Sequence, residues 1–152
     1  MSALKERISN EMKAALLGRH RFRGDVLRSL KAAILNEEVS LVKRDEGLSD
    51  AEIERVIARE VKKRKESAEL YRSNGRVELA DSEEKEAAIL QEFLPKQLSE
   101  DELRAVVAEV VAAMDEVSPQ QMGQVIGLVK SKVGTAGDGA MIAKIVKETL
   151  VK

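Results

Sequence analysis

The longest regular pattern of the chain is residues 49–75, SDAEIERVIAREVKKRKESAELYRSNG. Apolar residues recur in it every three or four positions, which is the spacing of one face of an α-helix. Ser49 and Glu52 form a capping box, which predicts the start of that helix, and Asn74-Gly75 is a turn signal that predicts its end. The expected buried stripe is Ile53, Val56, Ile57, Val61, Ala68 and Tyr71. We therefore expect one long amphipathic helix, which must pack against other helices to be stable.

Three more helices are expected around this one. The first should end at Gly18, because glycine is typical of helix C-termini, and the fourth at Pro95, because proline cannot continue a helix. In the second helix, the apolar spacing extends in the sequence to Val39 and Val42, before the turn at Gly47. The stripes of these helices are Leu4, Ile8, Met12 and Leu16; Phe22, Val26, Leu27, Leu30, Ile34 and Leu35; and Leu79, Ala87, Leu90 and Leu94. Residues 1–95 are thus expected to form a bundle of longer helices.

After Pro95 the expected helices are shorter. Their starts are marked by N-capping residues, namely Ser99 with Glu102, Ser118 before Pro119, and Asp138. Their stripes are Leu103, Val106, Val107, Val110 and Met114; Met122, Val125, Ile126 and Val129; and Met141, Ile142, Ile145, Val146 and Leu150. Gly123 and Gly127 lie one turn apart, a spacing that predicts the close approach of a second helix. The expected fold is all-α, with an N-terminal subdomain at residues 1–95 and a compact three-helix subdomain at residues 96–152.

The composition excludes several classes of function. Of 152 residues, 43% are hydrophobic, too many for a disordered chain, and the net charge of −1 gives no overall attraction to nucleic acid. Because there is no cysteine and a single histidine, thiolate and multi-histidine metal sites are excluded, and no metal or other cofactor is expected. The most apolar stretch, Ala105 to Met114, is too short to span a bilayer, and no signal pattern opens the chain. We expect a cytoplasmic protein without a membrane partner.

No catalytic residue can be assigned, because the chain has no nucleophile–base pair and no metal-binding set. The loop Gly134–Gly139 contains Gly-x-x-Gly, which could approach a phosphate, but it lacks the Gly-Lys-Ser/Thr ending of a Walker loop. We favour a helix–helix turn whose glycines take left-handed conformations. His20 has no catalytic partner, so we interpret it as a surface residue.

Two clusters of cations are candidates for phosphate contacts. The first consists of Arg59, Lys62, Lys63, Arg64 and Lys65; the second consists of Arg19, Arg21, Arg23, Arg28 and Lys31, interleaved with His20 and Phe22. The first cluster is also compatible with a solvated helix neutralised by the ion pairs Glu60–Arg64, Lys62–Glu66 and Lys65–Glu69. The second is also compatible with a charged turn that Phe22 anchors to the core. Both alternatives remain open for each cluster.

Several segments, in order along almost the whole chain, resemble the GatB/YqeY family. They are Met12-Lys-Ala-Ala, Leu27-Arg-Ser-Leu-Lys-Ala-Ala-Ile34 with Asn36-Glu-Glu38, Lys62-Lys-Arg-Lys-Glu-Ser67 through Tyr71 and Gly75-Arg76, Phe93-Leu-Pro-Lys-Gln-Leu-Ser99, Met122-Gly-Gln-Val-Ile126, and Asp138-Gly139 with Ile145-Val-Lys147. Larger members of the family are B subunits of the glutamine-dependent aspartyl/glutamyl-tRNA amidotransferase, a carbon–nitrogen ligase, whose helical C-terminal tail contacts tRNA. The resemblance implies two helical subdomains and a role in RNA binding, and it implies no catalysis, because the chemistry of that complex lies elsewhere.

The resemblance also points to residues. The Gly-Gln-Val segment corresponds to Gly123, Gln124 and Val125, and the terminal helix carries Lys144 and Lys147. The loop before that helix often carries a cation in relatives, but here residues 133–139 have none. Together with the two clusters, the candidate nucleic-acid contacts are Arg19, Arg21, Arg23, Arg59, Lys62, Lys63, Lys130, Lys132, Lys144 and Lys147.

Two functions remain open. The first is a non-catalytic accessory protein that binds tRNA or another RNA. The alternative is a helical interaction module that docks on an amidotransferase or an aminoacyl-tRNA synthetase without touching RNA. The missing nucleophile and nucleotide loop argue against a third reading, an amidotransferase that acts alone.

Overall fold

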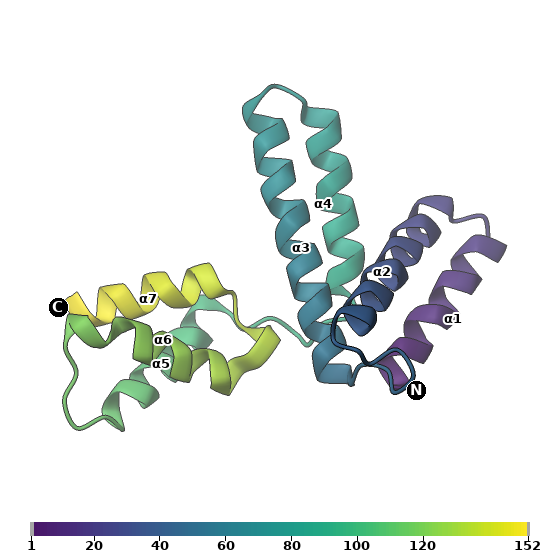
Figure 1. Ribbon diagram of the computed structural model, residues 1–152. Helices are drawn as coiled ribbons and strands as arrows, with labels where there is room; N and C mark the ends of the chain where they lie inside the picture. Colours follow the sequence, from purple (N-terminus) through teal and green to yellow (C-terminus); the bar gives the residue numbers. More distant parts are fainter. Residues whose placement is uncertain (1, 152) are drawn as a thin grey trace. The chain divides into compact units, whose positions relative to one another are not determined.

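The computed structural model describes residues 2–151, and within them it contains seven α-helices and no strand, which confirms the all-α prediction. The helices are α1 (Ala3–Leu17), α2 (Arg21–Ser40), α3 (Asp50–Ser73), α4 (Val77–Gln91), α5 (Glu100–Ala112), α6 (Met122–Val133) and α7 (Gly139–Val151) (Figure 1). The chain divides into two compact units, Met1–Leu94 and Pro95–Lys152. None of the helices in the described part of the chain is long and apolar enough to cross a membrane.

The N-terminal unit consists of two helical hairpins, α1–α2 and α3–α4 (Figure 1). The amphipathic stripes meet in one core, where seven large aliphatic side chains are almost fully buried: Ile8, Leu27, Leu30, Ile34, Ile53, Ile57 and Leu90. The stripe of α2 is shorter than predicted. Leu35 and Val39 are exposed on the flank of α2 beside the buried Ile34 and Glu38, and Val42 is exposed because it follows the end of the helix at Ser40. Leu79, predicted in the α4 stripe, is also exposed.

One charged side chain belongs to this core. Glu38 of α2 is 1% exposed, and its carboxylate accepts hydrogen bonds from Lys5 Nζ at 2.8 Å and from the Leu48 N–H at 3.3 Å. A buried carboxylate needs such partners, since desolvation without them is costly. Glu38 therefore fastens both α1 and the end of the α2–α3 loop to α2.

Both predicted capping boxes are confirmed. The Ser49 hydroxyl accepts from the Glu52 N–H and the Glu52 carboxylate accepts from the Ser49 N–H, and Ser99 and Glu102 repeat this arrangement. Glu52 also accepts a 2.9 Å hydrogen bond from Lys43 Nζ. That ammonium, helped by the Ser49 amide, lowers the pKa of Glu52 to about 2. The start of α3 is thus held by a carboxylate that stays ionised over the ordinary pH range.

Three helices of the N-terminal unit end in the same way. After α1, α2 and α3, the backbone N–H two residues beyond the C-cap donates to a carbonyl in the last turn of the helix. The three hydrogen bonds run from the His20 N–H to the Ala15 carbonyl, from the Lys43 N–H to the Glu38 carbonyl and from the Arg76 N–H to the Tyr71 carbonyl. This Schellman geometry requires a left-handed residue just before that N–H, where glycine is usual. Only α3 uses glycine, Gly75 at φ 75°; α1 uses Arg19 at φ 63° and α2 uses Val42 at φ 56°. Gly18 is the cap of α1, as predicted, but its own φ is −81°.

The C-terminal unit packs α5, α6 and α7 around a second aliphatic core, whose most buried members are Leu103, Val107, Val125, Val129, Ile142, Ile145 and Val146. The segment after Ser118 forms a 3₁₀ turn, Pro119–Gln121, and α6 begins only at Met122, which is 37% exposed rather than buried. The predicted close approach at Gly123 and Gly127 is wrong, because a Cβ added at either position would meet no atom within 4 Å. Gly137 is the crowded glycine, with Val133 Cγ2 at 2.5 Å from such a Cβ.

Candidate nucleic-acid interface

The ten candidate cations fall into two groups according to whether an acidic side chain neutralises them. Four have an acidic partner, namely Arg23, Arg59, Lys63 and Lys132. Six are exposed and have no ion-pair partner among residues 2–151, namely Arg19, Arg21, Lys62, Lys130, Lys144 and Lys147. Only the second group offers its full charge to a phosphate without first breaking a bond.

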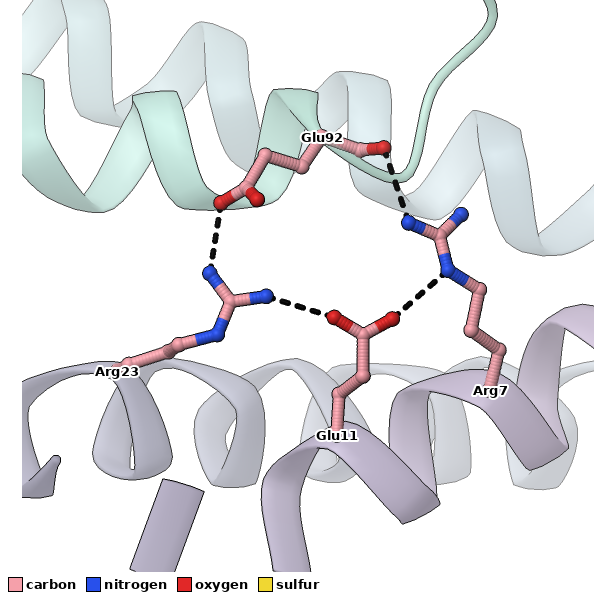
Figure 2. A network of polar contacts seen from close by, with 4 residues as sticks. All are labelled: Arg7, Glu11, Arg23 and Glu92. Atoms are coloured by element: carbon pink, nitrogen blue, oxygen red, sulfur yellow. Dashed lines mark hydrogen bonds and ion pairs between the residues drawn. The ribbon is translucent and has the colours of Figure 1, made fainter. Parts of the chain in front are cut away.

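Arg23 is part of the structure of the N-terminal unit rather than a free cation (Figure 2). Its guanidinium donates to Glu92 at 2.7 Å and to Glu11 at 2.7 Å, so it joins α2 to α1 and to the end of α4. Arg7 completes the network by donating to Glu11 at 2.8 Å, and it lies 4.6 Å from the centre of the Phe93 ring. The hydrogen bond to Glu92 is the main reason why the pKa of Arg23 is raised.

The basic run on α3 is only partly neutralised. Arg59 reaches Glu37 of α2 at 2.7 Å, and Lys63 lies 3.3 Å from Glu60. Of the three ion pairs predicted within this run, Glu60–Arg64 forms at 3.9 Å. The pairs Lys62–Glu66 and Lys65–Glu69 are absent from the described part of the chain.

Arg64 lies at the α3–α4 interface. It is 3.9 Å from Glu86, and its Nε is buried without a hydrogen-bond acceptor. Burial raises the pKa of Glu86, and the neighbouring Glu83 adds to the shift. Arg64 is therefore enclosed between helices and is not available to a ligand.

The solvent face of α3 carries one cation that the sequence reasoning missed. Arg55 is exposed and precedes Arg59 by four residues and Lys62 by seven, so helical spacing places the three on one face. The spacing of four and seven residues is the signal in the sequence that indicates this face, whereas the contiguous run 59–65 covers several faces of the helix. The three cations span about 10 Å along the helix.

The turn between α1 and α2 exposes almost all its side chains. Arg19, His20 and Arg21 are exposed, which confirms the surface position of His20. Phe22 is 45% exposed and Leu17 is 87% exposed. The alternative in which Phe22 anchors this turn to the core is therefore wrong. Arg23 and Gly24 hold the turn instead.

Three of the free lysines lie in the C-terminal unit. Lys144 and Lys147 are three residues apart on α7, on the face opposite the buried Ile142 and Val146. Lys130, in the last turn of α6, has its Nζ 3.6 Å from the position of a Cβ on Gly139, so it lies beside the first residue of α7. Lys132 instead contacts Glu109 of α5 at 2.9 Å and lowers the pKa of that carboxyl group.

These surfaces can attract anions through lysine and arginine side chains. Among residues 2–151 no three histidine, aspartate or glutamate side chains converge to hold a metal ion. The free cations are four lysines on helices and two arginines at the α1–α2 turn. Such exposed charges suit phosphate groups spaced along a nucleic-acid backbone.

Comparison with known proteins gives one family. The family described as Yqey-like protein matches residues 5–150, which is nearly the whole chain. A protein of Schizosaccharomyces pombe described as uncharacterized is 32% identical over 75 residues, and that match covers 49% of this chain and 61% of the yeast protein.

Proposed function

The chain belongs to the family of YqeY-like proteins, and on that premise we propose that it is a non-catalytic accessory protein that binds tRNA or another RNA. The observation that carries this proposal is the set of six exposed cations without an acidic partner. In a chain of net charge −1, such local sets are where a polyanion would be attracted. The resemblance to the tRNA-contacting tail of the amidotransferase B subunit makes tRNA the first RNA to test.

The binding mode follows from the side chains. Lysines act as point charges toward phosphates, so these contacts position the RNA without reading its sequence. Binding of this kind releases counterions, and affinity falls steeply as salt concentration rises.

The test uses the full chain and labelled tRNA, with dissociation constants measured by fluorescence anisotropy over a series of salt concentrations. We expect K144Q/K147Q to weaken binding and to reduce the slope of log Kd against log salt by about 1.5, since each lost phosphate contact contributes about 0.7–0.9. The matched control is K13Q/K85Q, which removes two exposed lysines outside the candidate set and should leave the slope unchanged. The absence of any complex at low salt with tRNA, with single-stranded RNA and with duplex RNA would refute the proposal.

A specific observation favours the second candidate, a protein-interaction module. Leu35 and Val39 are 44% and 57% exposed and lie one turn apart on α2, and Val42, just beyond the end of the helix, is 91% exposed. Exposed apolar stripes of this kind often mark protein contacts. If the chain docks on an amidotransferase or a synthetase, a partner protein should co-purify after ribonuclease treatment and be lost with L35S/V39S. Recovery of RNA alone would count against this candidate.

A further inference from the structure

We propose that the α1–α2 turn, residues 17–22, holds an unpaired base of the RNA against the ring of Phe22, with Arg19 and Arg21 on the adjoining phosphates. This inference rests on the proposed RNA-binding function and names the part of the RNA that the turn accepts.

The positive charge of the turn is uncompensated. Arg19 and Arg21 are exposed, and the acidic residues nearest along the chain are Glu11 and Asp25. Glu11 is already bonded to Arg7 and Arg23, and Asp25 lies 3.8 Å from Arg28. The arginines of the turn are therefore free to bind phosphate, which a guanidinium can do through two parallel hydrogen bonds.

Phe22, next to Arg21 in the chain, supplies an aromatic ring that is partly exposed. The chain has three aromatic residues; Phe93 is 3% exposed, Tyr71 is half-buried and Phe22 is 45% exposed. An aromatic ring beside free arginines is the combination on which proteins stack unpaired bases, and each stacked base contributes measurably to affinity. Leu17, 87% exposed, adds apolar surface at the other side of the turn.

The turn is anchored where it enters α2, which favours order before the RNA arrives. Arg23, the residue after Phe22, is fixed by the network of Figure 2. Next to it, Gly24 packs so closely on α1 that an added Cβ would lie 2.5 Å from Leu16 Cδ2. Arg19 keeps a left-handed backbone at φ 63°, a conformation that non-glycine residues disfavour and that tends to be retained at functional sites. Preorganisation of this kind reduces the entropy lost on binding.

An exposed aromatic ring favours an unpaired base over a duplex. In a duplex the faces of the bases are stacked on one another, and only edges and backbone remain for a protein. A ring such as Phe22 can use its face only with a base that has left the stack, as in a loop or a single strand. A duplex would still contact Arg19 and Arg21 but gain nothing from Phe22.

The experiment uses the full chain and an unstructured RNA of roughly 12 nucleotides, alone or annealed to its complement. Because the chain has no tryptophan, F22W introduces a single tryptophan, whose fluorescence can be excited apart from that of Tyr71 and which keeps an aromatic face. We expect single-stranded RNA to quench F22W and duplex RNA to leave it unchanged. F22L should weaken single-strand binding about tenfold without changing duplex binding. The control L70W places tryptophan at an exposed position on α3 and should not be quenched; thermal melts verify folding.

The outcomes separate this inference from the proposed function. If the wild-type chain binds neither RNA nor tRNA, both fall. If it binds RNA but F22W is not quenched, or F22L weakens single strand and duplex equally, the inference is overturned while the RNA-binding function stands. Quenching by the single strand together with its selective weakening in F22L supports the inference.

Discussion

Arg19 and Val42 place side chains in a backbone conformation that suits glycine, with φ values of 63° and 56°. For an L-residue this conformation costs roughly 1–2 kcal/mol, and it is worst for a β-branched side chain. Burial of the side chain does not offset this cost at either position, since Arg19 is exposed and Val42 is 91% exposed. The strain is sustained by the hydrogen bonds that close the two helix ends, from His20 to Ala15 and from Lys43 to Glu38.

Val42→Gly should therefore stabilise the N-terminal unit by about 1 kcal/mol. Glycine takes the required conformation freely, and little apolar burial is lost. The converse change, Gly75→Val, installs the same strain at the end of α3, where an added Cβ meets no atom within 4 Å, and should destabilise by a similar amount. Urea unfolding followed by circular dichroism measures both. Destabilisation by Val42→Gly would show that Val42 makes a stabilising contact.

Glu52 gives the N-terminal unit a pH dependence. Its pKa is lowered from 4.5 to about 2, chiefly by the hydrogen bond from Lys43. A carboxyl group whose pKa is lower in the folded state stabilises the fold above its unfolded pKa and loses that effect as pH falls. We expect the melting temperature to fall between pH 4.5 and 2, and Glu52→Gln, which keeps the capping box, to reduce that fall. Glu66→Gln, on an exposed face of the same helix, is the control; an equal effect there would exclude the Lys43–Glu52 pair as the cause.

The residue scale also shows where sequence reasoning succeeds. Ser49 with Glu52 is a local signal, complete within four residues, and it predicts the start of α3 correctly. The left-handed residue after α1 could not be predicted, because Gly18 suggested one position and the hydrogen bonds of the turn select the next, Arg19. Phe22 fits the helical period of α2, yet its position at the first turn leaves it outside the core.

At the scale of elements, periodicity predicts every helix and most of its buried face. Its failures lie at the flanks of the buried face, one position away from residues that are buried. Leu35 and Val39 follow the buried Ile34 and Glu38 of α2, and Leu79 precedes the buried Ala80 of α4, yet all three are exposed. A stripe in the sequence states which side chains share a face, whereas burial depends on how much of the width of that face the neighbouring helix covers.

The glycines of the C-terminal unit provide an element-scale prediction. Gly127 lies inside α6 with open space around its Cβ position, so Gly127→Ala should stabilise this unit by about 1 kcal/mol through helix propensity. Gly137→Ala is the matched control, and it should destabilise, because its Cβ would lie 2.5 Å from Val133 Cγ2. Chemical denaturation measures both. A loss of stability in Gly127→Ala would instead support the close helix approach that the Gly123–Gly127 spacing predicts.

At the scale of the whole molecule, the sequence predicts which cations exist but not which are free. Arg23 is neutralised by Glu92, 69 residues away, and Lys132 by Glu109, 23 residues away. Such partners depend on how the helices pack, so no local pattern predicts them. Within α3, the opposite error arises, because two of the three local pairs expected from four-residue spacing do not form. Exposed ion pairs of this kind contribute little energy, so sequence spacing alone does not ensure them.

The two units have separate aliphatic cores, and this predicts separate responses to core truncation. Leu30 is 1% exposed in the N-terminal core and Leu103 is 0% exposed in the C-terminal core. Either leucine-to-alanine change should cost its own unit about 2–5 kcal/mol. The single tyrosine, Tyr71, lies on α3, so its fluorescence reports the N-terminal unit alone. Leu30→Ala should shift the unfolding transition seen by tyrosine fluorescence to a lower denaturant concentration. Leu103→Ala should leave that transition unchanged and shift to lower denaturant only the part of the circular dichroism signal that comes from the C-terminal unit. Equal shifts of both signals in both variants would mean that the chain unfolds as one cooperative unit, despite its two cores.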